Sequence, residues 1–82
     1  MPRKYTVRER KLGREGNDAQ IDLDTGEILI DPRLLPKQWL HRLTHEAVHA
    51  AFPDASEAEV LRAERVIGGI LWRAGVRRIH LK

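Results

Sequence analysis

The segment Thr44-His45-Glu46-Ala47-Val48-His49 places two histidines four residues apart, with a glutamate directly after the first. In an α-helix, side chains at positions i and i+4 lie on the same face, one turn apart. Both imidazoles can therefore reach one metal ion, and Glu46 would point beside them toward a water bound to that ion. The alternative is that these polar side chains simply face solvent. The surrounding sequence helps to decide between a metal site and a solvated surface.

The sequence around this segment predicts a helix from about residue 36 to residue 52. Pro36 suits the first helical turn, where its missing N–H is not needed, and Pro53 ends the pattern. Between the two prolines, apolar residues recur at helical spacing, at Trp39, Leu40, Leu43, Ala47, Val48 and Ala51. The two histidines therefore fall in the C-terminal half of an amphipathic helix.

A second helix is predicted over residues 56–74. Its start, Ser56-Glu57-Ala58-Glu59, has the form of a capping box, in which Ser56 caps the first amides and Glu59 reaches back to the cap's own N–H. Gly75 is a suitable stop, and residues 75–82 would form a basic tail. Because the connection between the helices is short, we expect them to pack antiparallel as a hairpin.

Residues 1–31 have the pattern of a small antiparallel sheet of two or three strands. Residues 19–23 and 27–31 flank the turn Asp24-Thr25-Gly26 and predict a β-hairpin. The buried face of this hairpin is expected to comprise Ile21, Leu23, Ile28 and Ile30. Residues 4–10 alternate weakly and predict an edge strand. The expected fold is α+β, one minimal domain over residues 1–82 in which the sheet precedes the two helices.

Composition restricts the chemistry of any site. The chain has 82 residues and no cysteine, so disulfides and thiolate-bound metals are excluded, and a metal must use histidine, carboxylate and water. That set of ligands is typical of catalytic zinc. No apolar run approaches the length of a membrane span, and the N-terminus lacks the apolar segment of a signal peptide. We therefore expect a cytoplasmic protein that is neither secreted nor in a membrane.

Basic residues gather at the two ends of the chain, within residues 1–14 and 73–82, although the net charge is only +3. Basic ends can contact phosphates or an acidic partner, but they more often form a solvated surface. Aromatic residues make up only 5% of the chain, so no platform for stacking bases is evident. Nucleic-acid binding is therefore a weakly supported alternative.

A catalytic zinc needs a third protein ligand, and the second helix offers two candidates. Glu64 falls within an apolar arc of that helix, where a carboxylate is costly unless it is paired or bound to metal. The arc comprises Val60, Leu61, Ile67, Gly68 and Leu71. Glu64 is our leading ligand, and the competing interpretation for it is a salt bridge to an arginine. Glu57 lies near the same angular position and is the alternative ligand, although stabilising the helix N-terminus explains it more simply.

Three other polar residues have simpler explanations. Asp54 follows His49 by five residues, but it reads as a loop residue after Pro53. His41 lies one turn before His45, and His80 lies in the basic tail. We expect both of these histidines to be solvated.

At His45-Glu46-Ala47-Val48-His49 the chain resembles the zincin metallopeptidases, and with a candidate glutamate on the next helix it looks like their gluzincin branch. The run from Ile28 through Pro36 into this helix is similar to small HExxH proteins of bacteriophage and bacteria labelled as metallopeptidases. The resemblance covers roughly residues 19–78. It implies a zinc ion held by His45 and His49, with Glu46 as the catalytic base. A phage-encoded protein of this kind would act in the host cytoplasm.

The chain also departs from these families. It has no third histidine of the metzincin type, the spacing from His49 to Glu64 is short for large gluzincins, and we do not expect these 82 residues to form the second subdomain that completes a substrate cleft. We expect a zinc-dependent hydrolase, most simply a peptidase, that holds a peptide or protein substrate along the edge strand. The alternative is a non-catalytic metal-binding or basic adaptor module that binds protein or nucleic acid. A small core and an exposed sheet edge also favour a homodimer.

Overall fold

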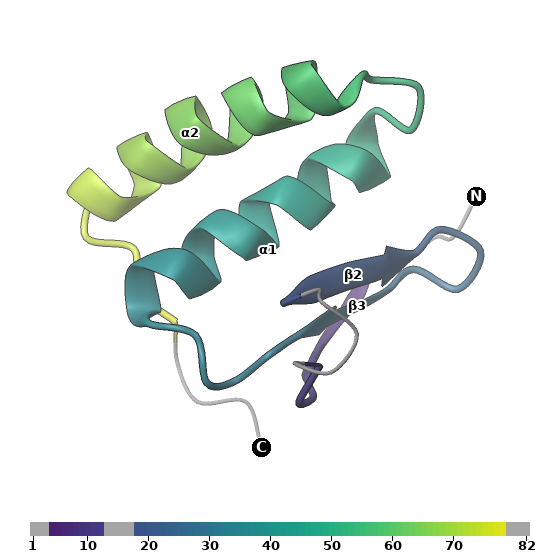
Figure 1. The fold of residues 1–82 in the computed structure, drawn as a ribbon, viewed down its shortest axis with the longest axis horizontal. Helices are drawn as coiled ribbons and strands as arrows, with labels where there is room; N and C mark the ends of the chain where they lie inside the picture. Colours follow the sequence, from purple (N-terminus) through teal and green to yellow (C-terminus); the bar gives the residue numbers. More distant parts are fainter. Residues whose placement is uncertain (1–3, 13–17, 79–82) are drawn as a thin grey trace.

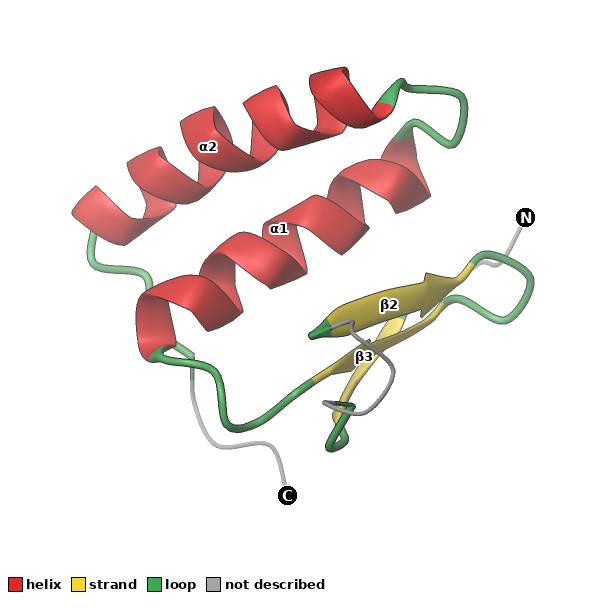
Figure 2. Cartoon of the chain, viewed as in Figure 1, coloured by secondary structure: helices red, strands yellow, loops and turns green. Residues whose placement is uncertain are grey.

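The computed structural model describes residues 4–12 and 18–78, which form a small sheet and two helices (Figures 1 and 2). The elements follow in the order β1 (Thr6–Glu9), β2 (Ala19–Asp22), β3 (Glu27–Ile30), α1 (Pro36–Ala51) and α2 (Glu57–Arg73). Helix α1 lies between the sheet and α2, and it contacts both β2 and β3 (Figure 1). The predicted α+β fold, a small sheet followed by two packed helices, is therefore confirmed.

The predicted hairpin is formed by β2 and β3, which pair antiparallel with Ile21 opposite Ile28. Gly26 closes the turn with a φ of 76°, a conformation that glycine adopts without steric cost. The Asp22 carboxylate accepts hydrogen bonds from the backbone N–H groups of Asp24 and Thr25 at 2.9 and 3.2 Å. The turn is thus fixed by local polar contacts that the sequence Asp-x-Asp-Thr-Gly supplies.

The sheet differs from the prediction in one respect, because it is mixed and not wholly antiparallel. Its strand order is β1-β3-β2, and β1 pairs parallel with β3, with Val7 opposite Ile28. The hairpin partner β2 occupies one edge of β3, so β1 takes the other edge as predicted. Alternation of side chains specifies which face of a strand is buried but not the direction in which it pairs, so the sequence pattern left this direction undetermined.

The core lies between the sheet and the first turns of α1. Ile28, Ile30 and Trp39 are its buried members. Partly buried apolar side chains pack around them, namely Val7, Ala19, Ile21, Leu34 and Leu43. Leu23 was expected on this buried face, but it is 45% exposed. The reason is that β2 ends at Asp22, so Leu23 belongs to the turn and leaves the pleat of the sheet.

The connection from β3 to α1 is held by Asp31. Its carboxylate accepts hydrogen bonds from the Arg33 guanidinium at 2.9 and 2.7 Å, and from the backbone N–H groups of Arg33 and Leu12 at 2.9 and 3.1 Å. The Arg33 side-chain bonds, followed by the backbone bonds, hold the pKa of Asp31 well below its usual value. The charged carboxylate therefore orients the segment that leads into α1.

The two helices form the predicted hairpin with the predicted cap. Ser56 Oγ accepts the backbone N–H of Glu59 at 3.2 Å, and Glu59 Oε1 accepts the backbone N–H of Ser56 at 2.9 Å. Val60 is fully buried against α1, and a Cβ on Gly68 would lie 3.0 Å from His41 Nδ1. The helices therefore approach closely where Gly68 meets His41. Neither helix of residues 4–12 and 18–78 has the length and apolar character needed to cross a bilayer.

Candidate metal centre

Helix α1 carries both histidines of the HExxH segment on one side, as its period requires. His45 and Glu46 are buried, whereas the side chain of His49 is 27% exposed. The ring centroids of His45 and His49 lie 4.9 Å apart, and the rings meet edge to face. The i and i+4 spacing therefore places two imidazoles within reach of one ion.

Glu57, the first residue of α2, lies opposite both histidines. Its carboxylate oxygens lie 3.2 Å from His45 Nε2 and 3.6 Å from His49 Nε2. One ligand atom from each of these three residues lies within 4.8 Å of the others. In the part of the chain that the structure describes, His45, His49 and Glu57 are the group of three that could hold a metal ion.

Glu64 lies on the opposite side of the His45 ring. Its Oε1 is 2.8 Å from His45 Nδ1, and its side chain is only 12% exposed. Because an ionised carboxylate can only accept, we assign a proton to Nδ1, and in the neutral imidazole Nε2 then presents its lone pair. Nε2 is the nitrogen that faces Glu57. Glu64 thereby selects the tautomer of His45 that a metal site at Glu57 needs.

Arg42 and His41 complete the surroundings of Glu64. Arg42 Nη1 lies 3.6 Å from Glu64 Oε1, and its Nε lies 3.5 Å from Oδ2 of Asp18, which directly precedes β2. His41 Nδ1 lies 3.6 Å from Glu64 Oε2. The arginine salt bridge that competed with metal ligation for Glu64 is thus present as a loose contact. Arg42 did not feature in the sequence prediction, although its spacing of three residues before His45 signals the same face of α1.

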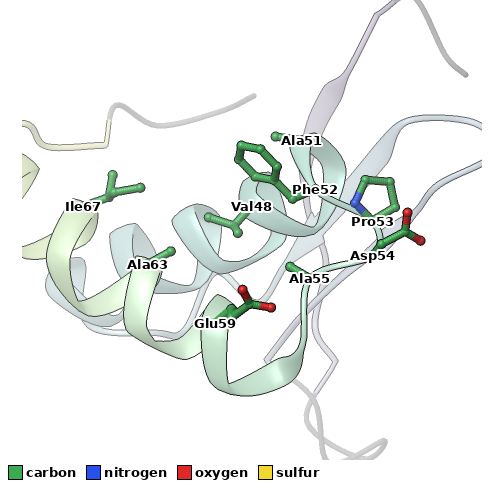
Figure 3. A pocket seen from close by; sticks show the side chains of 9 residues that line it. All are labelled: Val48, Ala51, Phe52, Pro53, Asp54, Ala55, Glu59, Ala63 and Ile67. Carbon is green, nitrogen blue, oxygen red and sulfur yellow. The ribbon is translucent and has the colours of Figure 1, made fainter.

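The predicted site residues thus divide into groups. One group contains the three residues whose ligand atoms converge, namely His45, His49 and Glu57. Glu46 lines the same pocket, and Glu64 contacts Nδ1 of His45, on the side of the ring away from Glu57. Asp54 lies apart, lining a different hollow beside the loop that joins the helices (Figure 3). His41 is mostly buried and not solvated as expected, because it packs against Gly68. His80 lies outside the described residues.

Glu46 lies in the wall of the pocket that contains the two histidines, and it is only 8% exposed. Burial raises the pKa of its carboxyl group, and the nearby His45 and His49 partly oppose that rise. A carboxylate with a raised pKa accepts a proton more readily than an ordinary glutamate. Burial therefore makes Glu46 a stronger base than its residue type alone would be.

The pocket around these residues opens against the edge strand β2. Its volume is about 510 Å³, and its walls come from β2, α1 and the start of α2. They comprise Asp18, Ala19, Gln20, Ile21, Arg42, His45, Glu46, His49, Glu57 and Leu61. The strand edge and the candidate ligands thus face the same space.

The residues present fit a metal ion. Two imidazole nitrogens and a carboxylate converge, and three protein ligands leave a position for water. The Nε2 lone pair of His45 faces a Glu57 oxygen at 3.2 Å, which is repulsive unless a cation, either a proton or a metal ion, lies between them. Because Glu57 is 64% exposed, its side chain is free to adjust to an ion. The cluster is a His-His-Glu group that could bind a metal.

Comparisons of this chain with protein-family models, with curated proteins and with solved structures found no match. The case for function therefore depends on the geometry of the cluster.

The buried position of Glu46 predicts a gain in stability when its charge is removed. Its folded pKa is raised above the ordinary value of 4.5, so stability falls as pH rises through 4.5 toward that raised pKa. In chelator, we expect Glu46→Gln to raise Tm at pH 8 and to leave Tm nearly unchanged at pH 4. Thermal unfolding followed by circular dichroism measures this.

The matched control is Glu57→Gln, which removes the same charge from a side chain that is 64% exposed. We expect no comparable gain from it. A lower Tm for Glu46→Gln than for the wild type at pH 8 would contradict the role of burial.

Proposed function

We propose that this protein is a zinc-dependent hydrolase with peptidase activity, and that His45, His49 and Glu57 hold the zinc. The observation that carries the proposal is the position of Glu57, whose two carboxylate oxygens face Nε2 of both histidines at 3.2 and 3.6 Å. Two imidazoles and a carboxylate form the ligand set of several catalytic zinc sites. The absence of cysteine makes a closed thiolate site impossible.

Glu64 is assigned to His45 and not to the metal in this proposal. A ligating histidine typically donates its other ring N–H to a carboxylate, which fixes the ring and raises its basicity. Glu64 Oε1 accepts from His45 Nδ1 at 2.8 Å and meets this requirement. Arg42 lies 3.6 Å from the same oxygen and stabilises the negative charge of Glu64 in a largely buried position.

Glu46 is the general base of the proposed reaction. A zinc ion held by His45, His49 and Glu57 would supply Lewis-acid polarisation of a substrate carbonyl and would acidify a nearby water. The buried Glu46 carboxylate would accept a proton from the attacking water and would deliver it to the leaving amine. Burial raises the pKa of Glu46, which favours the first of these transfers.

The substrate proposed for this site is an extended peptide. In the described residues β2 pairs only with β3, so its other edge can accept a further strand. Ala19, Gln20 and Ile21 of β2 line the pocket that contains Glu46. A peptide paired with β2 would therefore run past the candidate metal, with main-chain hydrogen bonds providing the affinity.

Measured zinc affinity distinguishes the proposed roles of Glu57 and Glu64. We expect Glu57→Gln to weaken zinc binding more than Glu64→Gln does, because Glu57→Gln removes a metal ligand. Glu64→Gln removes only the carboxylate that accepts the N–H of a ligating histidine, a loss that typically lowers metal affinity about 10–100-fold. Competition with a chelator of known affinity measures both. Asp54→Asn is the control, since it removes a carboxylate from the neighbouring loop, and it should bind zinc as the wild type does. Loss of binding in Glu64→Gln alone would restore Glu64 as the ligand, and unchanged binding in His45→Ala would exclude the site.

Peptidase activity depends on Glu46 if the proposed reaction is correct. Removing a general base typically costs about 100- to 10,000-fold in rate, so Glu46→Gln should lose nearly all turnover of a mixed peptide library while keeping stoichiometric zinc. Mass spectrometry of the cleaved library provides the readout, and elemental analysis confirms the metal content. Stoichiometric zinc with no turnover that depends on Glu46 would favour a non-catalytic metal-binding module.

A further inference from the structure

The outer face of α2, turned away from α1, exposes a band of large apolar side chains. Val66 and Ile70 are 53% and 62% exposed, and Ile67 lies beside them. Phe52, directly after α1, is 65% exposed and lines the same hollow as Ile67 (Figure 3). This hollow is also lined by Val48, Ala51 and Ala63. A contiguous apolar band of this kind on a small protein marks an interaction surface.

The residues on this face are arranged symmetrically about Val66. At 100° per residue, the residues within about 60° of Val66 on the outer side of the helix are Glu59, Arg62, Ala63, Gly69, Ile70 and Arg73. Ala63 and Gly69 lie three residues on either side of Val66, Arg62 and Ile70 lie four, and Glu59 and Arg73 lie seven. An antiparallel second copy of the helix therefore places Gly69 opposite Ala63, Ile70 opposite Arg62 and Arg73 opposite Glu59.

We propose that this face binds a second copy of the chain, with the two α2 helices antiparallel and Val66 near the two-fold axis. In a two-fold interface, residue i contacts residue j and residue j contacts residue i. Ala63 then lies opposite Gly69 of the partner subunit, and Glu59 lies opposite Arg73 of the partner subunit. The interface thus has Val66 at its centre, Ile70 against the aliphatic part of Arg62 of the partner subunit, and two equivalent Glu59–Arg73 ion pairs at its ends.

Charge favours the antiparallel arrangement over the parallel one. The N-terminal turn of α2 carries Glu57 and Glu59, and its C-terminal end carries Arg73 followed by Arg77. Antiparallel pairing places each acidic end beside a basic end, and it also pairs opposite ends of the two helix dipoles. Within the described residues, Arg73 forms no salt bridge inside its own chain. Its guanidinium is therefore available to a partner.

Gly69 gives an independent reason for a close neighbour on this face. A Cβ at Gly68 would meet His41, whereas a Cβ at Gly69 would meet nothing within 4 Å among residues 4–12 and 18–78. Packing within these described residues therefore does not require glycine at position 69, although glycine destabilises a helix interior relative to alanine. The distance between packed helices depends on the side chains at their contact. Ala63 and Gly69 allow two α2 backbones to approach closely on either side of Val66.

Dimerisation through this face leaves the candidate metal centre open. Glu57 points toward α1, and the pocket with His45 and His49 is bounded by β2. Metal binding and self-association therefore depend on different surfaces and can be tested separately.

Sedimentation equilibrium over about 1 µM to 1 mM, which spans moderate to weak affinities, tests the proposal. We expect the wild-type mass to rise from one chain to two. Val66→Asp should weaken the dimer by about 100-fold or more, because the two carboxylates would meet each other at the two-fold axis. Circular dichroism should show an unchanged monomer fold, since Val66 is 53% exposed in the monomer. A wild-type chain that remains monomeric throughout would overturn the proposal.

Crosslinking tests the geometry, and it benefits from the absence of native cysteine. Val66→Cys places a thiol beside its own copy at the two-fold axis, so mild oxidation should yield a covalent dimer rapidly. Arg65→Cys is the matched control, because the neighbouring exposed position points about 100° away around the helix. Equal crosslinking rates for the two variants, or a dimer insensitive to Val66→Asp, would show that the chain associates through another surface and would refute the proposal.

Discussion

The imidazole of His45 lies between two carboxylates, and the candidate site depends on this arrangement. Glu64 lies 2.8 Å from Nδ1 and Glu57 lies 3.2 Å from Nε2. A neutral imidazole can donate to only one of them, so the other nitrogen presents a lone pair to a carboxylate. A cation resolves that repulsion, and His49 supplies a further donor at the same point. A proton can meet this requirement as well as a metal ion, and the convergence of three ligand atoms makes the cluster a group that could bind a metal.

The small fold is organised so that α1 can support this cluster. The sheet packs on α1 from one direction and α2 packs on it from another, so the HExxH segment has protein on both sides (Figure 1). The Ser56–Glu59 capping box fixes where α2 begins, and Glu57 is the first residue of that helix. The cap therefore positions a candidate ligand, while the edge of β2 borders the same pocket.

Local sequence patterns were sufficient to predict the helices, the hairpin and the position of His45 and His49 on one side of α1. Each of these features depends on residue spacing over a short stretch of the chain. They favoured Glu64 over Glu57 as the third ligand, whereas the structure brings Glu57 together with the two histidines. The two residues are seven positions apart, so they differ by only about 20° around α2 but by roughly 10 Å along it. Only the register of the helical hairpin decides which carboxylate reaches Nε2, and that register depends on tertiary packing. The sequence did not predict the parallel pairing of β1 with β3 for a similar reason, because the direction in which two strands pair depends on the assembled sheet.

The ring nitrogens of the histidines provide the most direct test of the central claim that His45 and His49 bind a metal through Nε2. Long-range proton–nitrogen NMR of the ¹⁵N-labelled protein, recorded with and without one equivalent of zinc, reports each nitrogen separately. The account predicts that zinc shifts Nε2 of both residues, while Nδ1 of His45 keeps its proton and its bond to Glu64. Unchanged Nε2 resonances of His45 and His49 on addition of zinc would contradict it.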